Sequence, residues 1–445
     1  MTTGKMNLSY GEAAEAAGIA ERLRKNGFTA YFAGGCVRDF LMGKEPHDFD
    51  VATSATPEKV EALFPRTVPV GRQFGVILVI DSANRYYEVA TFRKDGGYQD
   101  GRHPEAVSFS GPEEDAARRD FTINGMFYDP EKEAVIDFVG GQKDLEQQMI
   151  RAIGDPHQRF EEDKLRLLRA IRFASTLHFK IENLTWQALV GEAPKISCVS
   201  VERIREEIVK MLMRSGATEG LQLLSQSGLL RVILPEIENL KEMTQAPGFS
   251  ADHNLLQMTC LLLDKMELSS EALAFAGLFY YFQAGSGEAD AESAQIYSQN
   301  NYARITQAAE VLRRLKASNE VIEYVSEVLD CQHLFYEVRE MREGQLKLFL
   351  SRESFQDELK LHQLHCQNAE ESLEFYDFIC KKLIAYKDEN LRPEALLNGH
   401  DLIELGMEPG PAMKPVLEEA YLLQLEGKLP DKKGAMDWAK QQAVK

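Results

Sequence analysis

The strand-like patterns of this chain stop near Asp144, and that change constrains the fold more than any other feature of the sequence. After it, apolar residues recur at helical spacing almost without interruption. Before it, β-rich runs bounded by turn residues alternate with helical segments. These runs are TAYFAGG (29–35), FDVATS (49–54), FGVILVI (74–80) and RYYEVATFR (85–93). We therefore expect an α+β head that is followed by an all-α region.

Charge and composition narrow the classes of partner. The net charge of −19 disfavours a protein that coats nucleic acid, because phosphates repel an acidic surface. Residues 1–180 contribute only −4 of it, with 24 Lys and Arg against 28 Asp and Glu, so a local basic site for RNA is compatible with the acidic total. We expect no membrane span and no secretory signal, because the chain lacks the required apolar runs. Six scattered cysteines favour free thiols in the cytoplasm.

Asp48 and Asp50 flank Phe49 in the second β-rich run. In a strand these two carboxylates would point to the same face and repel each other unless a cation lies between them. Mg²⁺ suits such a pair, because it is commonly held by one or two carboxylates together with substrate phosphates. A solvated strand edge is the alternative interpretation of an isolated D-x-D pattern.

A glycine pair precedes the aspartates. Gly34 and Gly35 follow an apolar strand, and Arg38 comes three residues later. Glycines let the backbone approach a phosphate closely, and an arginine can add a charged fork to it. An ordinary tight turn explains the glycines equally well when they are taken alone, and neither a Rossmann fingerprint nor a P-loop is present. Together with the aspartates, the pattern predicts a site for a nucleoside triphosphate on metal.

The stretch GGCVRDFLMG…HDFD resembles motif A of the class II tRNA nucleotidyltransferases, the CCA-adding enzymes of the polymerase-β superfamily. Further resemblances follow in order: EEDAARRDFTINGMFYDP (113–130) to motif B, VIDFVGGQKDL (135–145) to the hinge motif, RFEEDKLRLLRAIRFAS (159–175) to the nucleotide-template motif and SVERIREEI (200–208) to motif E. Bacterial poly(A) polymerases share much of this pattern.

The resemblance implies a domain order. It implies a polymerase-β-like catalytic head with a mixed, mostly antiparallel sheet, then a neck with the nucleotide-template helix, a degenerate HD-like helical body and a helical tRNA-binding tail. The boundaries we expect are 1–143, 144–215, 216–330 and 331–445.

The resemblance also implies which residues act. Asp48 and Asp50 would bind the catalytic Mg²⁺ ions while a tRNA 3′-hydroxyl attacks the α-phosphorus of a nucleotide and pyrophosphate leaves. Glu88 is a candidate third carboxylate, and the alternative for it is pairing with an arginine. The other expected nucleotide contacts are Gly35 and Arg38 for phosphate and sugar, Arg119 for the triphosphate, and Asp120 with Asn124 for the ribose. Asp120 and Asn124 are four residues apart, so we expect them on one helical face; a helix-start cap is the alternative role for Asp120.

The segment EDKLRLLRAIRF places Asp163, Arg166, Arg169 and Arg172 three residues apart, roughly on one helical stripe. An amphipathic helix with a basic solvated face explains this spacing alone. The resemblance implies instead that Asp163 and Arg166 read the Watson–Crick edge of the incoming base, and that Arg169 and Arg172 contact phosphate or base or orient the template.

Two further patterns in the C-terminal half bear on metal binding. Residues 247–283 resemble an HD-type phosphohydrolase region, but only His253 of its metal constellation remains and FYYF (279–282) replaces the expected His-Asp. We expect His253 to be structural. His362, His365 and Cys366 lie on an amphipathic helix without further ligands, so we interpret them as surface and core positions rather than a metal site.

The leading hypothesis is CCA addition to tRNA from CTP and ATP, in the cytoplasm, without a membrane or a stable protein partner. A-only addition stays open because Gly125 replaces a more frequent alanine and the tail is long; CC-only addition is disfavoured by the full-length loop at 93–109. A poly(A) polymerase is less favoured because the chain has no basic extension. A non-catalytic RNA-binding module is the alternative from a different class.

Overall fold

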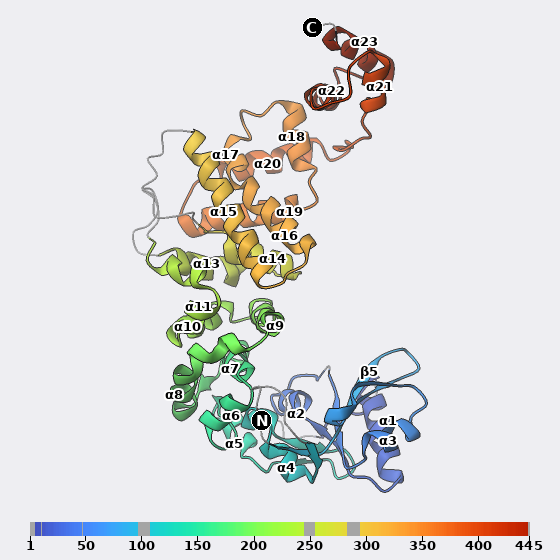
Figure 1. The fold of residues 1–445 in the computed structure, drawn as a ribbon, viewed down its shortest axis with the longest axis vertical. Helices are drawn as coiled ribbons and strands as arrows, with labels where there is room; N and C mark the ends of the chain where they lie inside the picture. Colours follow the sequence, from blue (N-terminus) through green and yellow to red (C-terminus); the bar gives the residue numbers. More distant parts are fainter. Residues whose placement is uncertain are drawn as a thin grey trace. The chain divides into compact units, whose positions relative to one another are not determined.

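The computed structural model describes residues 5–9, 11–46, 48–96, 107–243, 254–282 and 294–443. The chain separates into two compact units, Met1–Glu238 and Asn239–Lys445. The first unit combines a sheet with helices, and the described part of the second is helical (Figure 1). This confirms the expected fold class. The finer division into head, neck, body and tail stays a prediction.

A seven-stranded sheet organises the first unit. Its strands are β1 (Ala30–Ala33), β2 (Asp50–Thr53), β3 (Thr67–Gly71), β4 (Val76–Ile80), β5 (Tyr86–Thr91), β8 (Phe127–Asp129) and β9 (Ala134–Ile136), in the order β3-β4-β5-β2-β1-β8-β9. Five of the six neighbouring pairs are antiparallel, and only β2 and β5 run parallel. The sheet is therefore mixed and mostly antiparallel, as expected.

Helices α1 (Gly11–Lys25) and α3 (Pro57–Leu63) lie side by side against the sheet (Figure 1). Helix α4 (Pro112–Ala117) packs on it through Ala116, which shares one apolar cluster with Ala33, Ala52, Phe92 and Phe127. The short helix α2 (Gly35–Leu41) follows β1 directly after a glycine turn. The sheet thus fixes the start of α2 and of β2, where the predicted site residues lie.

The rest of the first unit is mostly helical. Its elements are α5 (Gly141–Glu146), α6 (Pro156–Glu162), α7 (Leu165–Leu177), α8 (Asn183–Glu192), α9 (Val201–Leu212), α10 (Ala217–Gln226), α11 (Leu229–Ile233) and α12 (Pro235–Glu238), with the hairpin β6 (Arg93–Asp95) and β7 (Val107–Phe109). Two short strands, β10 (Met149–Ile150) and β11 (Lys180–Ile181), pair in parallel. The expectation that no strand follows Asp144 was therefore wrong for β10 and β11. Each of them has only two residues, which is too short to show an alternation of apolar and polar side chains.

The helices of the second unit are α13 (Leu255–Lys265), α14 (Glu271–Phe279), α15 (Ala294–Arg314), α16 (Asn319–Asp330), α17 (Leu334–Glu337), α18 (Glu343–Leu350), α19 (Phe355–Ala369), α20 (Glu374–Ala385), α21 (Gly399–Glu404), α22 (Met413–Leu425) and α23 (Lys432–Ala443). Over the described ranges, we find no helix with the length and apolar character that a membrane crossing requires.

The patterns weighed for metal binding fall in this unit. Tyr281 is buried, and its hydroxyl lies 3.0 Å from His365 Nδ1. His362, His365 and Cys366 are all buried on α19, so the expectation that some of them lie at the surface was wrong. No group of three or more His, Cys, Asp or Glu side chains within the described ranges is arranged as a metal site. His253 and most of the loop at 93–109 lie outside those ranges.

Candidate active site

Two neighbouring strands bring Asp50 and Glu88 together. Val51 on β2 pairs with Val89 on β5, so the residues that precede them, Asp50 and Glu88, occupy matching positions on one face of the sheet. Asp48 precedes the strand, and the side chain of Phe49 between the two aspartates is buried while both aspartates are exposed. The sequence predicted both aspartates in a strand, but only Asp50 belongs to β2.

The charges around Asp50 fit a divalent cation. Asp50 keeps solvent contact, but enough protein surrounds it that desolvation, followed by the charge of Glu88 and with a smaller effect of Asp48, raises its pKa to about 7 against the opposing charge of Arg119. A hard cation at Asp50 would offset the repulsion from the neighbouring carboxylates that helps to raise the pKa of Asp50. Asp48 and Asp50 are therefore the pair that could hold Mg²⁺, and Glu88 adds a negative charge next to Asp50.

The glycine turn brings backbone close to this face. Gly34 has a φ of 74°, in the left-handed region that favours glycine, and a Cβ at this position would lie 3.3 Å from Arg119 Nη1. Gly35 begins helix α2 behind the turn. Arg119 is thus held next to the backbone that we expect to meet phosphate.

Arg38, Asn124, Asp120 and Arg169 form one ladder of hydrogen bonds, which is buried except at the half-buried Arg169. Arg38 Nη1 donates to Asn124 Oδ1 at 2.7 Å, and Asn124 Nδ2 donates to Asp120 Oδ1 at 3.3 Å. Arg169 Nε and Nη2 donate to Asp120 Oδ2 at 2.8 and 2.6 Å. Burial opposes ionisation of Asp120, but Arg169 and the backbone N–H of Phe121 hold its pKa at about 2. The ladder joins α2 to α7 through motif B.

Motif B is not one continuous helix at this point. Helix α4 ends at Ala117, and Asn124 lies in a separate 3₁₀ turn, Thr122–Asn124. The expectation that Asp120 and Asn124 share a helical face was therefore wrong, although their side chains do meet. The Asp120 carboxylate accepts from the N–H of the next residue, Phe121, at 2.7 Å, and this local bond competes with helical hydrogen bonding.

The ring of Phe173 lies close to three arginines that the sequence predicted in the site. The guanidinium carbons of Arg38, Arg169 and Arg172 lie 5.4, 5.2 and 4.2 Å from the centre of its ring. Arg172 Nε also donates to Glu207 on α9 at 2.6 Å. Sequence reasoning missed Phe173 and Glu207, because an aromatic residue in an apolar helix face and a glutamate in a charged run carry no distinct signal.

Asp163 and Arg166 each have a partner of their own. Arg203 Nη2 donates to Asp163 Oδ2 at 2.8 Å, and Arg166 Nη1 donates to Glu162 Oε2 at 2.9 Å. Asp163 is extended and lies before α7, which begins at Leu165, so the expected single stripe with Arg166, Arg169 and Arg172 was wrong for Asp163. Its carboxylate instead accepts from the N–H of Leu165 at 3.0 Å.

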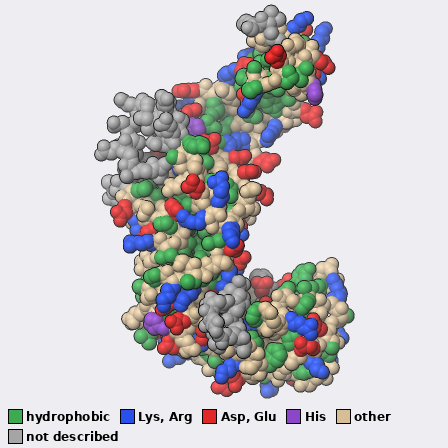
Figure 2. Space-filling model, viewed as in Figure 1, with side chains coloured by type: hydrophobic (Ala, Val, Ile, Leu, Met, Phe, Trp, Pro, Cys, Tyr) green, Lys and Arg blue, Asp and Glu red, His purple; other side chains and the backbone are tan. Residues whose placement is uncertain are grey.

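The basic residues of this unit are largely balanced by carboxylates. Lysine and arginine side chains are interspersed with acidic ones over the face shown in Figure 2. Around α7 the ion pairs are Arg151–Asp144, Arg159–Glu162, Arg166–Glu162, Arg169–Asp120, Arg172–Glu207 and Arg203–Asp163. A ligand that uses these arginines must therefore exchange with carboxylates already in contact.

Family models match most of the chain. The model for the Poly A polymerase head domain matches residues 30–151, the one for an RNA and SrmB-binding site of polymerase A matches 178–241, and that for tRNA nucleotidyltransferase domain 2 matches 296–439.

Relatives and solved structures agree with these matches. The CCA-adding enzyme of Limosilactobacillus reuteri is 31% identical over 424 residues, which are 92% of each chain. The CCA-adding enzyme of Geobacillus thermodenitrificans is 45% identical over 216 residues, 48% of this chain and 53% of that relative, so the stronger similarity spans about half of its length. The crystal structure of the Bacillus stearothermophilus CCA-adding enzyme in complex with CTP superposes with a TM-score of 0.73 at 28% identity, covering 96% of this chain and 97% of that one.

Proposed function

The chain belongs to the family of CCA-adding enzymes, and from this premise we propose that it adds CMP and AMP, taken from CTP and ATP, to the 3′ end of tRNA with release of pyrophosphate. The observation that carries the proposal is the register of β2 and β5, which sets Asp50 beside Glu88 on the face that Arg119 adjoins. Nucleotide-binding relatives such as the structure with CTP support the choice of substrate.

In this proposal the chain positions two substrates. Asp48 and Asp50 would hold Mg²⁺, and Glu88 is the candidate third carboxylate next to Asp50. Bound Mg²⁺ supplies neutralisation of the triphosphate charge and a more acidic attacking hydroxyl. The tRNA 3′-oxygen bonds to the α-phosphorus, the bond to the pyrophosphate oxygen breaks, and the hydroxyl proton is lost to solvent.

The remaining site residues bind and select the nucleotide. Arg119 lies next to the turn at Gly34, which suits contact with a triphosphate. The Arg38–Asn124–Asp120 ladder supplies polar groups for the ribose, with Gly35 at the helix start behind it. For the base, Asp163 and Arg166 offer an acceptor and donors, which suit cytosine and adenine edges. Arg169 and Arg172, stacked on Phe173, orient that template.

Incubation of the protein with tRNAs ending at N73, C74 or C75, separately with CTP and with ATP, tests the proposal. CCA addition predicts extension of N73 and C74 ends by CTP and of the C75 end by ATP. Extension of the C75 end alone would identify an A-adding enzyme, and a stop at C75 with both nucleotides a CC-adding one. Long A tracts would indicate a poly(A) polymerase, and tRNA binding without any extension a non-catalytic RNA-binding module.

The activity is assigned to the cytoplasm, where tRNA 3′ ends are matured, without a membrane or stable protein partner. The six cysteines are all free thiols, which suits a reducing compartment. Fractionation of cells that express the tagged chain tests this location.

A further inference from the structure

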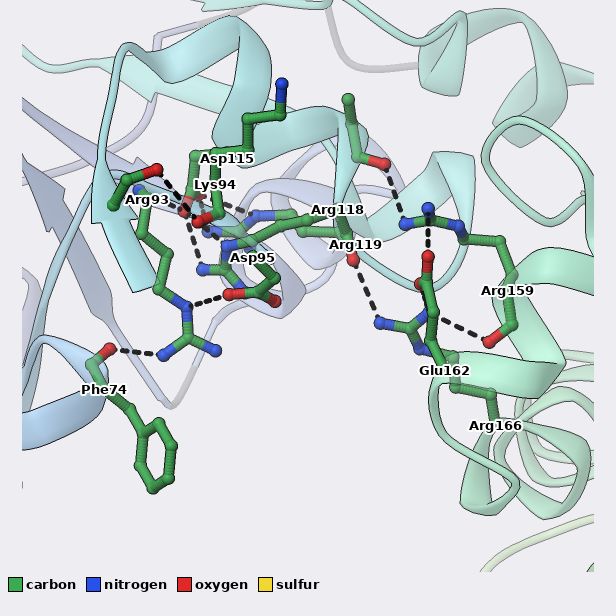
Figure 3. Close-up of polar contacts among 12 residues, drawn as sticks. Phe74, Arg93, Lys94, Asp95, Asp115, Arg118, Arg119, Arg159, Glu162 and Arg166 are labelled. Atoms are coloured by element: carbon green, nitrogen blue, oxygen red, sulfur yellow. Dashed lines mark hydrogen bonds and ion pairs between the residues drawn. The ribbon is translucent and has the colours of Figure 1, made fainter. Parts of the chain in front are cut away.

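One buried carboxylate holds two neighbouring arginines at the end of α4. Asp115 is 1% exposed, and its Oδ1 accepts from Arg118 Nε at 2.9 Å and Nη2 at 2.6 Å. Its Oδ2 accepts from Arg119 Nε at 3.2 Å and Nη2 at 3.0 Å. The N–H of Arg93 on β6 also donates to Oδ1, at 3.3 Å. Figure 3 shows Asp115, Arg118 and Arg119 together at the end of α4, with their contacts as dashed lines.

The guanidinium of Arg119 reaches from this carboxylate to the nucleotide side of the site. Its carbon lies 5.1 Å from the ring centre of Phe127, and Nη1 donates to the carbonyl of Asn124 at 3.4 Å. The same Nη1 is the atom nearest to the Cβ position of Gly34. Carboxylate, ring and carbonyl therefore fix Arg119 from three sides and hold Nη1 against the glycine turn.

A fixed arginine binds phosphate better than a mobile one. Ordering a long side chain at the moment of binding costs affinity, and a guanidinium that is already oriented avoids much of that cost. The pairing with Asp115 joins residues four apart in the sequence and is shielded from water, so it persists without a ligand. Asp115 itself is buried, so we expect it to act through Arg119 and not by contact with the nucleotide.

We propose that Asp115 is a positioning residue for nucleotide binding, which holds the Arg119 guanidinium in the orientation that meets the triphosphate. The inference rests on the proposed function, because it takes a nucleoside triphosphate as the ligand. In this role Asp115, the last residue of the acidic run Glu113–Asp115, contributes to nucleotide affinity.

Equilibrium binding of CTP and of ATP to the full chain, without tRNA, tests the proposal. Asp115→Asn should weaken both nucleotides about tenfold, the effect of losing one charge-assisted contact. Asp81→Asn is the matched control, because Asp81 is also buried and pairs with an arginine four residues on, Arg85, at 2.7 Å. That control should lose stability without losing nucleotide affinity.

A double-mutant cycle separates positioning from folding. In an Arg119→Ala background, Asp115→Asn should weaken CTP binding less than about twofold, because the group that it orients is gone. An equal penalty in both backgrounds, or unchanged CTP affinity in a folded Asp115→Asn protein, would overturn the proposal. If the Asn variant does not fold, Asp115→Glu keeps the charge but moves the oxygens; CTP binding equal to wild type by that folded variant would overturn it as well.

The two proposals can fail separately. Wild-type protein that binds CTP but extends no tRNA would refute the proposed function and leave the positioning role to be judged by the binding data. Wild-type protein that extends tRNA while the cycle shows no coupling between Asp115 and Arg119 would refute only the positioning role.

Discussion

Arg169 on α7 donates two hydrogen bonds to a single oxygen of Asp120, at 2.8 and 2.6 Å, across 49 residues of sequence. The pair joins the strand-rich part of the first unit to the helix that carries the predicted base-reading arginine, Arg166. The Asp120 carboxylate also accepts hydrogen bonds from the N–H of Phe121 and from the side-chain amide of Asn124, so both of its oxygens have donors.

Asp120→Asn should lower the free energy of unfolding at pH 7 by about 2 kcal/mol, because it removes the charge of a buried carboxylate that accepts two hydrogen bonds from the half-buried Arg169. The native pKa of about 2 lies below the ordinary 3.8, so the stabilisation is present above pH 4 and is lost as the pH falls from about 4 to 2. Urea unfolding of wild type and variant at pH 7 and pH 3 measures both effects. Equal stability of the two proteins at pH 7 would contradict the compensated pair.

Asp48→Asn and Asp50→Asn should each reduce nucleotide incorporation about 100- to 1,000-fold while tRNA binding stays close to wild type. The reason is that each change removes a proposed Mg²⁺ ligand, while both side chains are exposed, so the fold loses little. Single-turnover extension and filter binding of tRNA provide the two measurements. Retained incorporation in the double variant would reject the assigned mechanism.

Gly34→Ala should destabilise the first unit by about 1 kcal/mol, because a side chain at a φ of 74° is strained. It should also weaken CTP binding, since its Cβ would press on Arg119 Nη1. Gly27→Ala, which also introduces a side chain at a positive φ (85°) but has no atom within 4 Å of its Cβ position, is the control. Equal CTP affinity of the Gly34→Ala and Gly27→Ala proteins would contradict the expected effect of Gly34 on Arg119.

Arg166→Ala should relax selection among the four nucleotides about tenfold, because a charged donor to the base edge is lost. Competition between CTP and UTP on the N73 end measures it, with Arg85→Ala, in the turn between β4 and β5, as the control. An unaltered preference would remove Arg166 from the template.

Acid should weaken the second unit through His362. Burial, with a smaller effect of His365 and against that of Glu371, lowers its pKa to about 4 from the ordinary 6.5. Between pH 6.5 and 4, His362 is therefore protonated in the unfolded chain but neutral in the native one. Up to about 3 kcal/mol of the free energy of unfolding is lost as the pH falls through this range. His362→Gln should flatten this dependence in urea unfolding, whereas the exposed His400→Gln should not. Equal slopes would refute the assignment.

The sequence predicted strands β1, β2, β4 and β5, which fall within the four β-rich runs. Strands β4 and β5 largely alternate between buried and more exposed side chains, whereas β1 and β2 are buried at nearly every position and show up as short apolar runs. Strand β3 was missed because its central residues, Val68, Pro69 and Val70, are exposed at an edge and give no burial pattern. A sheet edge with proline reads as a loop.

The partners of the site residues could not be predicted. Spacing by three suggested that Asp163 shares a stripe with Arg166, but a local bond to the N–H of Leu165 keeps Asp163 outside the helix. Arg203 and Glu162, which pair with these two residues, are single charges in charged runs. The packing of α6, α7 and α9 determines that Arg166 pairs with Glu162 and Arg203 with Asp163.

The arginines around α7 have a consequence for turnover. Each already rests against a carboxylate, so an arriving nucleotide or RNA phosphate gains only the difference between a new anion and the resident one. Under the proposed function, each resident carboxylate would re-form its ion pair once the triphosphate is cleaved. This exchange would lower the free-energy cost of releasing the extended tRNA end.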